Sequence, residues 1–282
     1  MKKLLLIILI LLFSLSGCTN NKETENGKPI IAVSIVPQAT FVEKVCSDNF
    51  KIVTMIPSGA SAETYEPTPY QMAEFENALI YFSIGVPSEE NSILPFVSNK
   101  TKVVKLHLKA EEQYSPLMID GTRDPHLWLS PKRVAVMVKA IADELSILDP
   151  ENRKLYEENS RKYINELNSL DSEVKEKLKD LKGRSFIAFH PAFGYFADDY
   201  SLNMYALEEH GKEADAKRIS QMAELAKKEN IKTVFYQAET SGRQAKAFAE
   251  EIGGQATMLE PMSGDYINNI GKMADAIKKA MN

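Results

Sequence analysis

The sequence predicts an α/β protein in which two β/α lobes, each built on a four-stranded and mainly parallel sheet, are joined by one long rigid α-helix. Three observations predict this class. Short apolar runs alternate with stretches of helical spacing in the first half of the chain, the same alternation returns in the second half, and one long amphipathic stretch separates the two. Such alternation is typical of parallel sheets covered by helices on both faces. A chain of 282 residues is long enough for two such domains.

The first 28 residues are expected to lie outside the lobes. Residues 1–17 contain two lysines followed by LLLIILILLF, which is too short for a membrane span of about 20 residues and typical of a secretory signal peptide. The sequence LSGC, ending at Cys18, resembles the lipobox of bacterial lipoproteins and predicts that Cys18 is lipidated. An ordinary signal peptide with an incidental cysteine is the alternative. Residues 18–28 are predicted to form a flexible tether, because no apolar side chain follows Cys18 there.

Charge and cysteine content narrow the class of partner. The formal charge of −5 becomes −7 once the two lysines of residues 1–17 are removed. So acidic a chain offers no basic surface to offset phosphate repulsion, and we expect no nucleic acid partner. If Cys18 carries lipid, only Cys46 remains and no disulfide can form within the chain. Cys46 shares a predicted helical face with Phe41 and Val42, which indicates a buried, inert thiol.

The N-terminal lobe is expected over residues 29–148. Pro69 and Pro131 suit the first turn of a helix, and Ser130 is a favourable N-cap. Strands are predicted over residues 30–36, 51–56, 78–84 and 102–106, and helices over residues 38–48, 69–77, 88–98 and 131–147.

Residues 149–182 are expected to form the linking helix. Asp149-Pro150 is a helix start, and Lys182-Gly183 ends the pattern. A helix of roughly 30 residues is about 45 Å long. A coiled-coil partner is one explanation for its apolar stripe, but a connector between domains is favoured because the alternation resumes directly afterwards. The stripe consists of Tyr156, Tyr163, Leu167, Leu170, Val174, Leu178 and Leu181.

The C-terminal lobe, residues 183–282, repeats the order of the first lobe. Gly253-Gly254 is a good helix stop before its last strand. Strands are predicted over residues 184–189, 202–207, 232–236 and 255–259, and helices over residues 192–200, 217–229, 241–253 and 265–280.

The candidate functional residues are two histidines and two glutamates. His126 and His190 each stand beside a proline, in different lobes. Ligands of open parallel sheets bind beyond the carboxyl ends of the strands, so both imidazoles are expected to face a cleft between the lobes. Glu63 lies just past the second strand and Glu260 directly after the last, which are equivalent places. Two imidazoles with two carboxylates suit zinc, manganese or ferrous iron.

The two other histidines have less specific surroundings. His107 is predicted to form a solvated edge with Glu111 and Glu112. His210 is expected on an exposed loop at the rim of the cleft.

Five short motifs stand in order along the chain: SIVP (residues 34–37), TYEPTP (64–69), DPHLWLSP (124–131), FHPAFGYF (189–196) and LEPM (259–262), the last followed by Asp265-Tyr266. With these motifs the sequence resembles the metal-binding (solute-binding) subunits of zinc/manganese ABC importers, over nearly the whole chain. The resemblance implies two lobes joined by one long helix, with one divalent metal as transported ligand between them. It also implies an extracytoplasmic protein, anchored to the cell membrane by lipid on Cys18, that delivers metal to a membrane permease. We expect it to be monomeric.

Two departures from the family pattern bear on the metal. The family carries Pro-His before Thr-Tyr-Glu-Pro, where this chain has Ala62-Glu63, and Asp before the last proline, where it has Glu260. His190 resembles the zinc-type members, whereas manganese-type members carry glutamate there, so Zn²⁺ is favoured over Mn²⁺ or Fe²⁺. Oxygen ligands weaken that preference. Residues 107–123 hold only one histidine, so no metal-gathering loop is predicted.

Two other functions remain open at this point. A binding protein of the same fold that has lost metal and holds an organic ligand would explain the departure at Glu63. A metal-dependent hydrolase would need an open coordination position and a nearby general base. The chain contains neither an HExxH pairing nor a GxSxG turn, and we expect no enzymatic activity.

Overall fold

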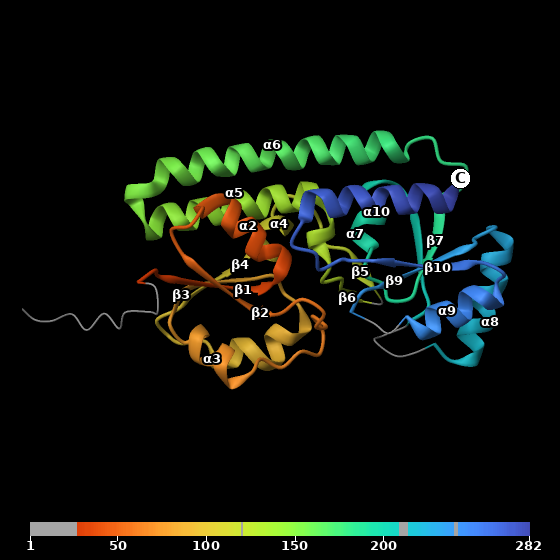
Figure 1. The fold of residues 1–282 in the computed structure, drawn as a ribbon, viewed down its shortest axis with the longest axis horizontal. Helices are drawn as coiled ribbons and strands as arrows, with labels where there is room; N and C mark the ends of the chain where they lie inside the picture. Colours follow the sequence, from red (N-terminus) through yellow and green to blue (C-terminus); the bar gives the residue numbers. More distant parts are fainter. Residues whose placement is uncertain (1–26, 120, 209–213, 240–241) are drawn as a thin grey trace, which may run out of the picture.

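The computed structural model describes residues 27–119, 121–208, 214–239 and 242–282, and it has two α/β lobes with a long helix running along both (Figure 1). The predicted signal peptide, Cys18 with most of the predicted tether, and His210 lie outside the described residues. None of the helices in the described ranges is long and apolar enough to cross a membrane.

The N-terminal lobe has the four predicted strands, and the helices that were predicted to alternate with them. Its elements are β1 (Ile30–Ile35), α2 (Val36–Cys46), β2 (Lys51–Ile56), α3 (Pro69–Phe75), β3 (Ala78–Ser83), β4 (Lys102–Lys105), α4 (Leu106–Glu111) and α5 (Pro131–Leu148). The four strands are parallel, in the order β2-β1-β3-β4. The whole of β1 is buried, because it is a central strand of apolar sequence with helices on both faces of the sheet (Figure 1).

The C-terminal lobe has the same topology. Its elements are β7 (Ser185–Ala188), α7 (Gly194–Asp199), β8 (Asn203–Ala206), α8 (Ala216–Lys228), β9 (Thr233–Gln237), α9 (Arg243–Glu251), β10 (Gln255–Leu259) and α10 (Tyr266–Met281). All four strands are parallel, in the order β10-β9-β7-β8. In both lobes, therefore, the first strand lies between the second and the third, as expected for a repeated unit.

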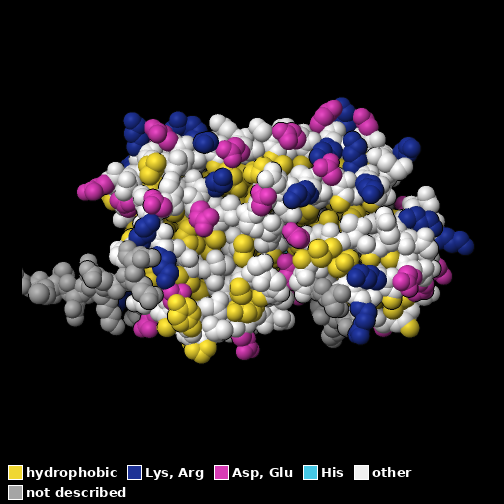
Figure 2. All heavy atoms as spheres, viewed as in Figure 1, with side chains coloured by type: hydrophobic (Ala, Val, Ile, Leu, Met, Phe, Trp, Pro, Cys, Tyr) yellow, Lys and Arg dark blue, Asp and Glu magenta, His cyan; other side chains and the backbone are white. Residues whose placement is uncertain are grey.

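The linking helix is α6 (Arg153–Leu178), which packs on α5 and α2 of the first lobe and on α10 of the second. It is shorter than predicted because residues 150–152 form a 3-10 turn and the helix ends at Leu178. The predicted stripe from Tyr156 to Leu178 is buried against these helices of the same chain. That contact confirms the connector and accounts for the stripe without a coiled-coil partner. Acidic and basic side chains are interspersed over its outer face (Figure 2).

One local prediction was incomplete, and two elements were not anticipated. The predicted helix 88–98 is helical as far as Phe96, but it consists mainly of a π turn at Glu89–Ile93 followed by a 3-10 turn at Leu94–Phe96, where Pro95 has no N–H to donate. The short helix α4 and a small hairpin of β5 (Met118–Ile119) and β6 (Thr122–Arg123) were not anticipated.

The predicted solvated edge at His107 is wrong. His107 is buried, because α4 turns it toward the sheet together with Leu106 and Ala110. Burial, aided by the charges of Arg123 and Lys105, lowers the pKa of His107 to about 4. Glu112 is exposed, as predicted. Burial of Cys46 is confirmed, and it raises the pKa of that thiol to about 11, as expected of an inert cysteine.

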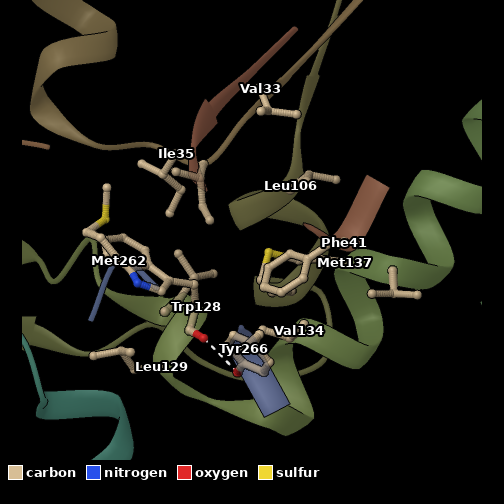
Figure 3. Close-up of a cluster of buried hydrophobic side chains, with 14 of the residues drawn as sticks. Val33, Ile35, Phe41, Leu106, Trp128, Leu129, Val134, Met137, Met262 and Tyr266 are labelled. Carbon is tan, nitrogen blue, oxygen red and sulfur yellow. Dashed lines mark hydrogen bonds between the residues drawn. The ribbon is translucent and has the colours of Figure 1, made fainter. Parts of the chain in front are cut away.

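One hydrophobic core runs from the N-terminal sheet through α6 and α10 into the second lobe, and a smaller one lies under α8 and α9. At the junction of the lobes Trp128 packs among Leu129, Met262 and Tyr266 (Figure 3). The Trp128 indole donates a hydrogen bond to the Pro261 carbonyl (2.9 Å), and the Tyr266 hydroxyl donates one to the Trp128 carbonyl (2.8 Å). These two hydrogen bonds fix the DPHLWLSP motif, which contains His126, to the second lobe.

Candidate metal centre

Three of the four predicted site residues meet between the lobes. Glu63, His126 and His190 each offer a ligand atom, and these atoms lie within 4.8 Å of one another. They line a cavity of about 130 Å³. The first two residues come from the N-terminal lobe and His190 from the C-terminal lobe, as the strand-end argument predicted.

His126 is held by the aspartate of its own motif. One carboxylate oxygen of Asp124 accepts the backbone N–H of His126 (2.9 Å) and lies 2.8 Å from its Nδ1. A carboxylate accepts hydrogen bonds and does not donate them, so Nδ1 carries the proton and Nε2 keeps a lone pair. Nε2 lies 3.4 Å from Nε2 of His190, which directs that lone pair toward the second lobe.

His190 lies between two carboxylates. Its Nδ1 is 2.6 Å from Glu208 Oε2, and its Nε2 is 3.1 Å from Glu63 Oε1. Burial alone would lower the pKa of His190, but Glu208 and Glu63 together outweigh it and raise this pKa to about 9. The hydrogen bond from His190 in turn lowers the pKa of Glu63. A cation bound among these donors would take the place of the proton on Nε2 of His190, so metal binding here would compete with protons.

Glu63 reaches the cavity from the loop after β2. Its backbone N–H donates to the Ser61 hydroxyl (3.2 Å), and Gly59 turns the chain with a positive φ of 80°. Glu66, three residues on, does not line this cavity; it lines an open groove with Pro67 and Phe96. Of these two glutamates it is therefore Glu63, directly before the TYEPTP motif, that faces the histidines.

Glu260 is not among the residues brought together. It follows β10, as predicted, but it is exposed and does not line the cavity. Two carboxylates that were not predicted do line it, Glu208 and Glu239. Each lies two residues beyond a strand end, after β8 and β9 respectively. The rule that pointed to Glu63 could have found them, although neither stands in a distinctive motif.

The donor set is that of a transition-metal site. Two imidazole nitrogens and a carboxylate oxygen suit Zn²⁺, Mn²⁺ or Fe²⁺ better than Ca²⁺ or Mg²⁺, which prefer oxygen ligands throughout. Asp124 and Glu208 lie behind the two histidines in the positions that orient metal-binding imidazoles in other proteins. The structure therefore supports binding of a divalent metal, without fixing which.

Comparison with known proteins finds proteins of zinc uptake. The family model described as "Zinc-uptake complex component A periplasmic" (ZnuA) matches residues 31–280. The high-affinity zinc uptake system protein ZnuA of Bacillus subtilis (strain 168) is 27% identical over 293 residues, which cover 94% of this chain and 92% of that protein. A crystal structure of a ZnuA deletion mutant with zinc bound matches with a TM-score of 0.85 and 34% identity, covering 90% of this chain and 98% of that one.

A second relative is longer than this chain and is matched over only part of its own length. The zinc-binding lipoprotein AdcA of Streptococcus pneumoniae (strain ATCC BAA-255 / R6) is 29% identical over 307 residues, which cover 99% of this chain but only 61% of AdcA. The present chain thus spans less than two thirds of that protein.

Proposed function

Because the chain belongs to the family of periplasmic A components of zinc-uptake complexes, we propose that it captures one divalent metal ion between its lobes and passes it to the membrane permease of an ABC importer. The observation that carries this proposal is the convergence of Glu63, His126 and His190 within 4.8 Å. Membership of a transport family also sets the chain apart from enzymes, including the metal-dependent hydrolases considered above.

Zn²⁺ is the cargo that we propose first. Two nitrogen ligands favour zinc over manganese, and the relatives named above are zinc proteins by their own descriptions. Because a carboxylate oxygen also suits Mn²⁺ and Fe²⁺, these ions are the alternative cargoes. An organic ligand has less support, because charged and polar side chains dominate the lining of a cavity of only about 130 Å³.

We propose further that the mature protein is a monomer tethered outside the cytoplasm by lipid on Cys18. The lipid anchor is supported by the LSGC sequence, the polar residues 19–28, and the description of AdcA as a lipoprotein. Mass spectrometry of the N-terminal peptide from membranes would detect the acyl chains. Free protein starting at another residue would contradict this.

Elemental analysis and chelator competition on the purified protein test the metal proposal. We expect one zinc per chain, and we expect His126→Ala/His190→Ala to weaken zinc binding by more than about 100-fold, since loss of a residue behind a metal ligand already costs about 10–100-fold. Glu63→Gln should also weaken binding, whereas Glu66→Gln, its neighbour outside the cavity, should not. Unchanged zinc and manganese affinity in the double variant would refute the site.

A further inference from the structure

The three donors described so far leave one position of a four-coordinate metal without a protein ligand. Among the described residues, three carboxylates of the C-terminal lobe follow strands near the cavity: Glu208, Glu239 and Glu260. We propose that Glu239 is the fourth ligand of the bound cation. This inference rests on the proposed function, because it assigns a further residue to the same site.

Glu239 is placed close to the three donors, although its carboxylate lies outside the group of ligand atoms within 4.8 Å of one another. It lines the same cavity as Glu63, His126 and His190. Its Oε2 is buried and has no hydrogen-bond partner among the described residues. Buried polar atoms without partners are rare in native proteins and call for an explanation such as an ion. A divalent cation held by the two imidazoles would supply the missing partner.

Glu208 is already engaged. Its Oε2 lies 2.6 Å from Nδ1 of His190, on the side of the ring that faces away from Glu63 and His126. A carboxylate in that place orients the imidazole and increases its basicity, so it supports a ligand rather than being one.

Glu260 is directed elsewhere. Its side chain is exposed, and its backbone is fixed from the other side because the Asn269 amide donates to the Glu260 carbonyl at 2.7 Å. The next residue, Pro261, accepts the Trp128 indole N–H. These contacts hold residues 260–261 against α10 and the lobe junction. Glu260 is still near enough for its charge to act on Glu239, which makes it a matched control for charge alone.

The resulting site has two nitrogen and two oxygen ligands, one of each from each lobe. His126 and Glu63 come from the N-terminal lobe, and His190 and Glu239 from the C-terminal lobe. Two carboxylates balance the charge of a divalent cation, and four ligands satisfy tetrahedral zinc. The oxygen pair would also make the site harder than a three-histidine site, so Mn²⁺ should bind measurably as well.

Zinc dissociation constants of Glu239→Gln and Glu260→Gln, measured by chelator competition beside the wild type, test this assignment. Each change removes one negative charge and keeps the shape of the side chain. We expect affinity to fall about tenfold or more in Glu239→Gln and to stay within about twofold in Glu260→Gln, since charges near a surface interact weakly. Thermal unfolding of the two variants with a chelator present should match the wild type.

The visible absorption spectrum of bound Co²⁺ separates a ligand from a nearby charge. Loss of a carboxylate ligand should change the d–d bands in Glu239→Gln, while Glu260→Gln should keep the wild-type bands. Wild-type affinity in Glu239→Gln, unchanged bands in that variant, or a loss carried by Glu260→Gln instead would overturn the assignment. A wild-type protein that takes up no metal would refute the proposed function itself, so the two failures are distinguishable.

Discussion

The two lobes share one strand order but differ in how firmly they are packed. The central strands are mostly buried in both sheets, β1 and β3 in the first and β7 and β9 in the second. The edge strands differ more, because β2 is half buried whereas β8 and β10 are partly exposed along most of their length, as β4 is. The N-terminal sheet belongs to the core that includes α6 and α10, while α8 and α9 cover a smaller, separate core. The two lobes therefore have the same topology but are not equally well packed.

One element of the C-terminal lobe is attached to the other lobe. Asp199 at the end of α7 accepts hydrogen bonds from Arg133 (2.9 Å) and Ser130 (2.5 Å), and Lys132 lies 2.6 Å away. At the start of α7, the hydroxyl of Tyr195 accepts the backbone N–H of Leu117. His190, just before α7, is thus anchored close to His126, whereas Glu208 follows the partly exposed β8 and Glu239 follows β9, whose last two residues are half-buried. Although His190 belongs to the C-terminal lobe, these contacts of α7 tie it to the N-terminal lobe, which carries Glu63 and His126.

Loss of the ion pair between Asp199 and Arg133, which ties α7 to the N-terminal lobe, should have the largest effect on stability. The side chains of Asp199 and Arg133 are 1% and 5% exposed, so Asp199→Asn leaves a buried guanidinium without its counter-charge. We expect a loss of about 3–5 kcal/mol in the free energy of unfolding, measured by urea denaturation with a chelator present. Asp143→Asn, in the exposed pair with Lys139, should cost less than about 1 kcal/mol. Equal losses would mean that α7 is not anchored as described.

The interior of the N-terminal lobe should respond to acid through His107. Its pKa is about 4 in the folded protein against an ordinary value of 6.5, so the unfolded chain binds the proton first as pH falls. Stability should be complete above pH 6.5 and decline by about 2 kcal/mol toward pH 4, after allowance for partial solvent screening. His190 affects stability over a different pH range. Its pKa is raised in the folded protein, so the stability that its protonated form contributes is lost as pH rises from 6.5 to about 9.

Urea denaturation of the wild type and His107→Gln between pH 4 and 7, again with a chelator, measures this dependence. The variant should show a shallower decline, since glutamine does not titrate. Parallel curves would show that His107 does not determine acid stability.

A smaller effect is expected where the start of α7 meets the motif of His126. A Cβ on Gly194 would lie 2.6 Å from Asp124 Oδ2, so Gly194→Ala must displace the carboxylate that orients His126. Zinc affinity should fall by up to about tenfold, as for other losses behind a metal ligand. Gly271→Ala in α10, where a Cβ meets nothing within 4 Å, is the control and should keep wild-type affinity. Equal affinities in chelator competition would contradict the close contact.

Much of this arrangement could be predicted from sequence because it follows local rules. Apolar runs of strand length located the sheets, the ends of those strands pointed to Glu63 and His190, and the DPHLWLSP motif pointed to His126. Glu208 and Glu239 were missed because an isolated glutamate after a strand looks like any solvated residue until the loops are folded together. His107 was misjudged for a similar reason: whether a short helix buries a histidine depends on the sheet beneath it, and the chain around it carries no signal of that contact.

The place of Trp128 has a practical consequence. It is the only tryptophan of the chain, and its ring centroid lies 5.2 Å from that of His126. Light absorbed at the red edge of the protein spectrum therefore excites a single indole beside the cavity. Quenching or a spectral shift of its emission would report, without any added dye, when a cation enters and when it leaves.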